Sequence, residues 1–104
     1  MICEWLDVAD SQSVKDCAQR LASAGIEINV LVNNAGVCPT QGVFSVNEET
    51  FEMALEVNTL GPFRTCQAFV PKMMQRGYGR VVNVSSGGVS CGEDLDPARG
   101  NLNR

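Results

Sequence analysis

Histidine is absent from this sequence, lysine occurs only at Lys15 and Lys72, and Tyr78 is the one tyrosine. Without histidine, a serine or cysteine nucleophile lacks its usual base, which excludes the common Ser-His type of hydrolase. The five cysteines form no C-x-x-C pair, which argues against both a zinc site and a disulfide framework. We therefore expect reduced thiols, no metal site and a cytoplasmic protein.

Long hydrophobic runs and clusters of charge are also missing. The first ten residues, MICEWLDVAD, have neither the basic start nor the apolar core of a signal peptide, and they are too short and polar for a membrane span. The net charge is -4 and the eight Lys and Arg are scattered, which argues against a nucleic-acid or membrane surface. With 104 residues, one small domain with a small-molecule partner is the expectation.

What is present is an alternation of strand-like and helix-like segments. Short runs rich in β-branched and aromatic residues occupy 2–6, 28–32 and 80–84, and apolar residues at helical spacing occupy 11–24 and 48–76. The order β-α-β-α-β predicts an α/β fold, namely a partial Rossmann-like, doubly wound parallel sheet with right-handed crossovers. Because the run 28–32 is almost continuously apolar, we expect helices on both faces of that strand.

The ends of these segments carry recognisable signals. Asp10 and Asn47 are good N-caps for the two helices, Gly25 is a C-terminal stop, and Gly77 begins a turn. Beyond Gly88 the apolar periodicity disappears. We therefore assign residues 1–90 to the domain and 91–104 to an irregular tail.

Polar or small residues follow each predicted strand. Asp7 and Val8 follow the first, Asn33 to Gly36 the second, and Ser85 to Gly87 the third. Parallel sheets of this type bind ligands beyond the carboxyl ends of their strands. The sequence thus predicts one site at that edge.

Four segments in order, LDVAD, LVNNAG, VNTLGP and GRVVNVSS, resemble the short-chain dehydrogenase/reductase family. The ordered set, over about residues 4–90, is more specific than any single motif. The resemblance implies that residues 1–90 are a partial NAD(P)-binding domain. It also implies an oxidoreductase that uses NAD or NADP on a small-molecule carbonyl or alcohol substrate.

The family's cofactor contacts carry over to five positions. Asp7 would meet the adenine amino group, and the N–H of Val8 would bond to the ring. Asn33, Ala35 and Gly36 would line the adenosine ribose, where small residues allow close approach. From the residues alone, simpler alternatives stay open: Asn33 can end a strand by bonding to neighbouring backbone, and Asp7 can be an ordinary loop carboxylate.

Two catalytic positions also carry over. Asn58 matches the family's Asn that holds a water of the proton relay, and Ser86 matches the Ser that hydrogen-bonds the reacting carbonyl. Asn58 falls on the apolar stripe of its helix, so we expect a buried side chain with polar partners. Because Pro62 has no N–H for the Asn58 carbonyl, we also expect the helix to bend there. The alternatives are a core Asn bonded to backbone and a plain turn at Ser86.

The departures from the family are equally informative. No G-x-x-x-G-x-G motif precedes the first strand, and no Tyr with a Lys four residues later follows Ser86. We therefore expect a fragment of a reductase that is catalytically incomplete and binds cofactor weakly, if at all. The alternative function is a non-catalytic protein that pairs through the helix 48–76, as a homo-oligomer. For the sheet, we predict that 28–32 pairs in parallel with 80–84, while 2–6 either takes the free edge or stays unpaired.

Overall fold

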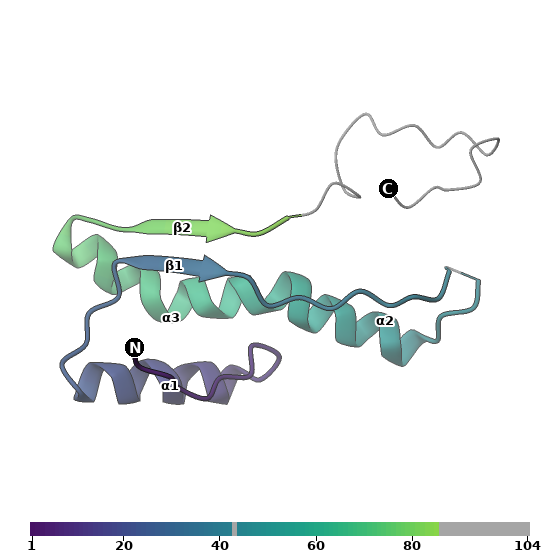
Figure 1. Ribbon diagram of the computed structural model, residues 1–104, viewed down its shortest axis with the longest axis horizontal. Coiled ribbons are helices and arrows are strands. Elements are labelled where there is room, and N and C mark those ends of the chain that lie inside the picture. Colours follow the sequence, from purple (N-terminus) through teal and green to yellow (C-terminus); the bar gives the residue numbers. More distant parts are fainter. Residues whose placement is uncertain (43, 86–104) are drawn as a thin grey trace.

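The computed structural model describes residues 1–42 and 44–85, which form one helix, a strand, an interrupted long helix and a second strand. The elements are α1 (Ser11–Ser23), β1 (Val30–Asn33), α2 (Glu48–Leu55), the π-helical turn η1 (Glu56–Leu60), α3 (Gly61–Arg76) and β2 (Arg80–Asn83) (Figure 1). The helices and the last two strands predicted from the sequence are confirmed. The tail predicted at 91–104 lies outside the described residues.

The two strands form a parallel pair, as predicted. Val30 lies opposite Arg80 and Asn33 lies opposite Asn83. The ladder extends beyond both ends of the strands, through hydrogen bonds from the Arg80 N–H to the Asn29 carbonyl and from the Val84 N–H to the Asn33 carbonyl. Both arrowheads in Figure 1 point the same way, so the two carboxyl ends share one edge.

The strand predicted at 2–6 is wrong, whereas the alternative that this segment stays unpaired is confirmed. A short strand needs a neighbour for its ladder, and β1 pairs only with β2 among the described residues. Arg20 of α1 holds the segment instead. Its guanidinium donates to the Glu4 carboxylate at 3.0 Å and to the Trp5 carbonyl at 2.8 Å.

The helix ends follow their sequence signals. The Asp10 carboxylate accepts the Gln12 N–H at 2.9 Å, and the Asn47 side chain accepts the Thr50 N–H at 2.7 Å. Gly25 and Gly77 have φ values of 72° and 78°, the left-handed conformation that ends a helix without steric cost for glycine. These local interactions fix where α1 and α2 begin and where α1 and α3 end.

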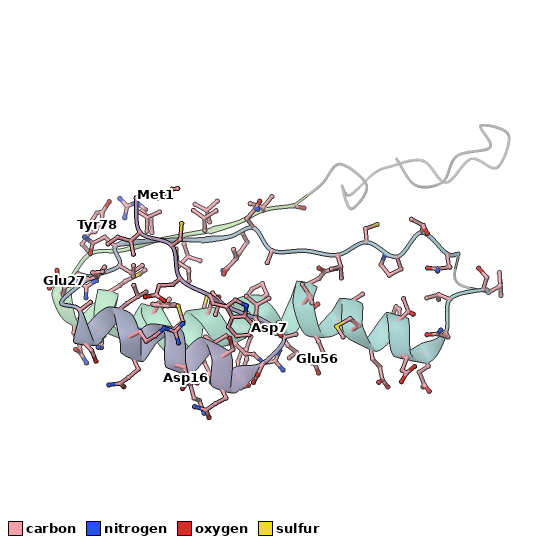
Figure 2. All side chains as sticks on the ribbon, turned by 60° about the horizontal axis from the view of Figure 1, so that its bottom comes forward. Met1, Asp7, Asp16, Glu27, Glu56 and Tyr78 are labelled. Carbon is pink, nitrogen blue, oxygen red and sulfur yellow. The ribbon has the colours of Figure 1, made fainter. Side chains whose placement is uncertain are left out.

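The helices α1 and α3 lie on the same side of the sheet. Figures 1 and 2 show α1 and α3 on one side of the strands, and α3 packs against both β1 and α1. Val14, Cys17 and Met73 form the buried apolar core of the described residues. The other face of the sheet is open, with Val30 and Val32 about half exposed, so the expectation of cover on both faces is wrong for this part of the chain. No helix among residues 1–42 and 44–85 is long and apolar enough to cross a membrane.

The long helix changes its hydrogen-bond ladder just before Pro62. The π-helical turn η1 separates α2 from α3, and it ends one residue before Gly61 and Pro62. Proline has no N–H for the α-helical bond to the Asn58 carbonyl, and a wider turn accommodates the missing donor. The π-helical turn itself was not predicted from the sequence, and the predicted bend of the axis stays a prediction.

Replacing Pro62 by alanine should convert residues 56–60 to regular α-helix. The new N–H can donate to the Asn58 carbonyl, and one such bond should raise the free energy of unfolding by about 1 kcal/mol. Backbone chemical shifts of residues 56–60 and a urea titration would measure the two effects. A π turn that persists in the variant would mean that the packing of Gly61 against Val8 sets the geometry.

Candidate functional site

A groove lies at the carboxyl edge of the sheet. Its volume is about 650 Å³, and it is lined by the turn after β1, the end of β2 and the η1–α3 junction. The lining residues are Asn33, Asn34, Ala35, Gly36, Val37, Cys38, Asn58, Thr59, Pro62, Asn83, Val84 and Ser85. The structure therefore brings Asn33, Ala35, Gly36 and Asn58 together, as the sequence predicts.

Asn33 joins three elements through its side chain. Its Nδ2 donates to Oδ1 of Asn83 at 2.8 Å, and its Oδ1 accepts the hydroxyl of Thr65 at 2.6 Å. Thr65 is buried at 3% exposure, so its hydroxyl depends on this partner and on the Pro62 carbonyl. Asn33 thus has a structural role, but the alternative that it bonds to neighbouring backbone is wrong, because its partners are the side chains of Asn83 and Thr65. A contact of Asn33 with the ribose stays a prediction. The Asn33 backbone would have to make it, because the side chain is already bonded to Asn83 and Thr65.

The turn after Asn33 presents its backbone to the groove. Asn34, Ala35 and Gly36 are exposed, and the N–H groups of Ala35 and Gly36 make no hydrogen bond within the described residues. A Cβ at Gly36 would lie 3.4 Å from Oδ1 of Asn58, which is already a tight contact. Small residues here leave two free donors beside an open space.

Asn58 clamps the chain that leaves this turn. Its Oδ1 accepts the Val37 N–H at 2.9 Å, and its Nδ2 donates to the Val37 carbonyl at 2.7 Å. The predicted polar partners are confirmed, but the predicted burial is wrong, because Asn58 is exposed. Neither α1 nor the short sheet has a substantial contact with η1, so this end of the apolar stripe stays uncovered. The Asn58 carbonyl lacks its α-helical donor because Pro62 follows, as expected.

Asp7 and Val8 lie in the segment directly before α1. The Asp7 N–H donates to Oγ of Ser13 at 2.8 Å, and the Asp7 carboxylate accepts the Ala9 N–H at 2.9 Å. Asp7 thus acts as a turn-forming carboxylate, the simpler alternative, with further acceptor capacity left. The Val8 N–H has no partner among the described residues, and Val8 shares a small apolar pocket with Ala35. Ser86, the predicted carbonyl-binding residue, lies outside the described residues.

Two residues of this region were missed by sequence reasoning. Thr65 completes the contacts of Asn33, and Arg64 bonds to both Val8 and Glu56. The available signal was weak, namely two polar residues on a helix shortly after the Gly61-Pro62 pair. Within residues 1–42 and 44–85 no group of three His, Cys, Asp or Glu is placed to hold a metal ion. Burial raises the pKa of the Cys17 thiol, which lies in the core and takes no part in the groove.

The comparisons with known proteins agree with this geometry. A family model described as short chain dehydrogenase matches residues 2–93. Estradiol 17-beta-dehydrogenase 11 of Macaca fascicularis is 35% identical over 81 residues, covering 78% of this chain and 27% of that protein. The 3-oxoacyl-(acyl-carrier-protein) reductase FabG of Thermotoga maritima is also 35% identical over 81 residues, covering 78% of this chain and 33% of its own length.

Solved structures give the same result. A gluconate 5-dehydrogenase from Burkholderia cenocepacia, in complex with NADP and tartrate, superposes with a TM-score of 0.73 at 28% identity, over 78% of this chain and 32% of that chain. A short-chain dehydrogenase from Streptomyces avermitilis superposes with a TM-score of 0.74 at 37% identity, over 82% of this chain and 31% of that chain. The fold is that of a partial Rossmann-like domain, and the chain belongs to the short-chain dehydrogenase family. It spans about a quarter to a third of the length of these relatives.

Proposed function

We propose that this chain carries the adenosine-binding part of an NAD(P)-dependent oxidoreductase that acts on carbonyls or alcohols. The observation that carries the proposal is the set of unpartnered N–H groups, on Val8, Ala35 and Gly36, at one edge of the sheet. Two similar solved structures support the cofactor class: the gluconate 5-dehydrogenase from Burkholderia cenocepacia is in complex with NADP, and an alcohol dehydrogenase from Thermococcus sibiricus is complexed with 5-hydroxy-NADP.

The residues present fit the adenosine end of such a cofactor. A purine ring needs a donor for its ring nitrogen and an acceptor for its amino group, and the Val8 N–H and the Asp7 carboxylate offer these. Ala35 and Gly36 leave room for a ribose against the backbone. Asn33, which directly precedes this turn, is held in place by its side-chain bonds to Asn83 and Thr65.

For the reaction, the bound cofactor would supply or accept a hydride. Ser86 would donate a hydrogen bond to the substrate carbonyl, and the Asn58 carbonyl would hold a relay water. The sequence supplies no Tyr and Lys pair after Ser86 to deliver the proton, and no glycine-rich turn for the pyrophosphate. We therefore propose that these 104 residues alone bind the cofactor weakly and do not complete the reaction.

Replacing Ala35 by leucine should abolish binding of adenosine monophosphate (AMP). The larger side chain would hold a ribose away from the free N–H groups of the turn. Amide shifts followed by NMR during an AMP titration should move at Val8 and at Ala35 to Gly36 in the unaltered chain, and stay still in the variant. The matched control is Thr40→Leu, an exposed position later in the same loop that should bind as the unaltered chain does. Equal binding of AMP by both variants would contradict the proposal.

Pairing through the long helix is a second candidate, because that helix exposes large apolar side chains. Leu60 is 38% exposed, Phe63 57% and Met74 75%. Replacing Phe63 by glutamate should shift the chain from dimer to monomer in sedimentation velocity if this surface pairs, since burying a charge in an apolar interface is costly. A monomeric unaltered chain would rule this candidate out.

A further inference from the structure

Arg64 of α3 makes four contacts, two with the distant segment at Val8 and Ser11 and two with Glu56, eight residues earlier on the same long helix. Nε donates to Oγ of Ser11 at 3.1 Å, and Nη1 donates to the Val8 carbonyl at 3.1 Å and to the Glu56 carbonyl at 3.2 Å. Nη2 forms an ion pair with the Glu56 carboxylate at 2.5 Å. The Arg64 side chain is 16% exposed and the Glu56 side chain 41%, so the contacts to Val8 and Glu56 are partly buried and the contact to Ser11 is exposed.

These contacts complete the immobilisation of the peptide units around Val8. The Asp7 N–H donates to Ser13 of α1, the Ala9 N–H donates to the Asp7 carboxylate, and the Val8 carbonyl is bonded to Arg64. The Val8 N–H is the remaining polar group, and it is unpartnered among the described residues. The neighbouring backbone therefore fixes the direction of this one free donor.

The same guanidinium holds the π-helical turn that carries Asn58. Its bond to the Glu56 carbonyl lies at the first residue of η1, and Figure 2 shows Asp7 and Glu56 near each other where the N-terminal segment meets the long helix. Val8 also packs on Gly61, where an added Cβ would come within 3.0 Å of the valine side chain. Arg64 thus connects the purine end of the proposed site to the helix turn beside the groove.

We propose that Arg64 is a positioning residue that sets the purine specificity of this chain through the orientation of the Val8 N–H. The inference rests on the proposed function, because it takes an adenine nucleotide as the ligand. Adenine offers a ring nitrogen that accepts this N–H, whereas hypoxanthine carries a proton at the same ring position and cannot accept it. A lysine at position 64 would keep the charge but could not place donors on Ser11, Val8 and Glu56 at once.

The test compares AMP with inosine monophosphate in amide-detected NMR titrations. The unaltered chain should prefer AMP by at least about tenfold, because inosine monophosphate mismatches the Val8 N–H and also lacks the amino group that the Asp7 carboxylate would accept. Arg64→Lys should lower this preference to the part that the Asp7 carboxylate supplies through the adenine amino group, while shifts at Ala35 and Gly36 persist with both ligands. A purely structural loss would weaken both ligands equally and leave their ratio unchanged, which would overturn the proposal.

The matched control is Arg76, another arginine of α3. It donates to the Ile28 carbonyl and to Asn29 Oδ1 at the opposite end of β1. Arg76→Lys removes comparable bonds away from the site, so it should keep the full preference for AMP. If it lowers the preference as much as Arg64→Lys does, the positioning role is wrong.

A second readout needs no ligand. The ¹⁵N order parameters of Val8 and Ala9 should be about 0.85 in the unaltered chain and fall toward about 0.6 in Arg64→Lys, but not in Arg76→Lys. If AMP causes no shifts in the unaltered chain, the proposed function fails and the order parameters alone decide whether Arg64 positions Val8. Should Arg64→Lys not fold, Ser11→Ala removes the partner of Nε in its place, and an unchanged preference in that variant would overturn the inference.

Discussion

Replacing Asn33 by alanine is expected to lower the free energy of unfolding by about 2–4 kcal/mol, measured by urea titration with circular dichroism. The variant loses the bond to Asn83 between the strands and leaves the buried hydroxyl of Thr65 without its closest acceptor. A loss of this size is a large share of the stability of a small domain.

Asn34 provides the matched control for this prediction. It is the same residue type one position later, it is exposed, and its side chain makes no hydrogen bond within the part of the chain that the structure describes. Asn34→Ala should change the free energy of unfolding by less than about 0.5 kcal/mol. Equal losses in the two variants would show that Asn33 does not connect the strands and α3 in solution.

Assayed with NADH or NADPH and a panel of ketones, the 104-residue chain is expected to show no turnover. A general acid typically contributes a factor on the order of 10² to 10⁴ in rate, and no suitable group stands at the groove among the described residues. Tyr78 precedes β2, at the end of the strand opposite the groove, and its ring lies 5.0 Å from the Arg80 guanidinium. Lys15 and Lys72 line a different pocket, between α1 and α3.

A Ser86→Ala variant controls this assay. Turnover that appears in the unaltered chain and disappears in the variant would show that Ser86 acts in a complete site. A partner copy, or a residue outside those discussed above, would then supply the proton. Turnover that is equal in both chains would point to a contaminating enzyme and leave the expected absence intact.

Local signals in the sequence predicted most of the fold. Asp10 and Asn47 cap helices through bonds that span two or three residues, so their role is visible in the sequence itself. The parallel pairing of β1 with β2 follows from the β-branched runs and the helix between them. The segment 2–6 has a strand-like composition, but a strand also requires a neighbour, which composition does not reveal.

The motifs in the sequence predicted which residues line the candidate site, but they did not predict the long-range contacts that hold those residues in place. Asn58 was expected to be buried because it lies on the apolar stripe of its helix. Helical spacing defines such a stripe but does not show whether another element covers it, and the structure leaves Asn58 exposed. The contacts of Arg64 with Val8 and of Thr65 with Asn33 join residues far apart in sequence, which no local pattern encodes. The π-helical turn was not predicted either, and the missing donor of Pro62 is the sequence feature that hints at it.

By the function proposed above, this chain would contain the adenosine half of a dinucleotide site and not the rest. The most direct measurement is one set of NMR titrations with AMP, NADH and nicotinamide mononucleotide, read at the amides of Val8, Ala35 and Gly36. AMP and NADH should bind with Kd values within about threefold of each other, because groups beyond adenosine add little without their contacts. Nicotinamide mononucleotide should leave these amides unshifted. NADH binding about a hundredfold tighter than AMP, or shifts caused by nicotinamide mononucleotide at the same amides, would contradict the claim.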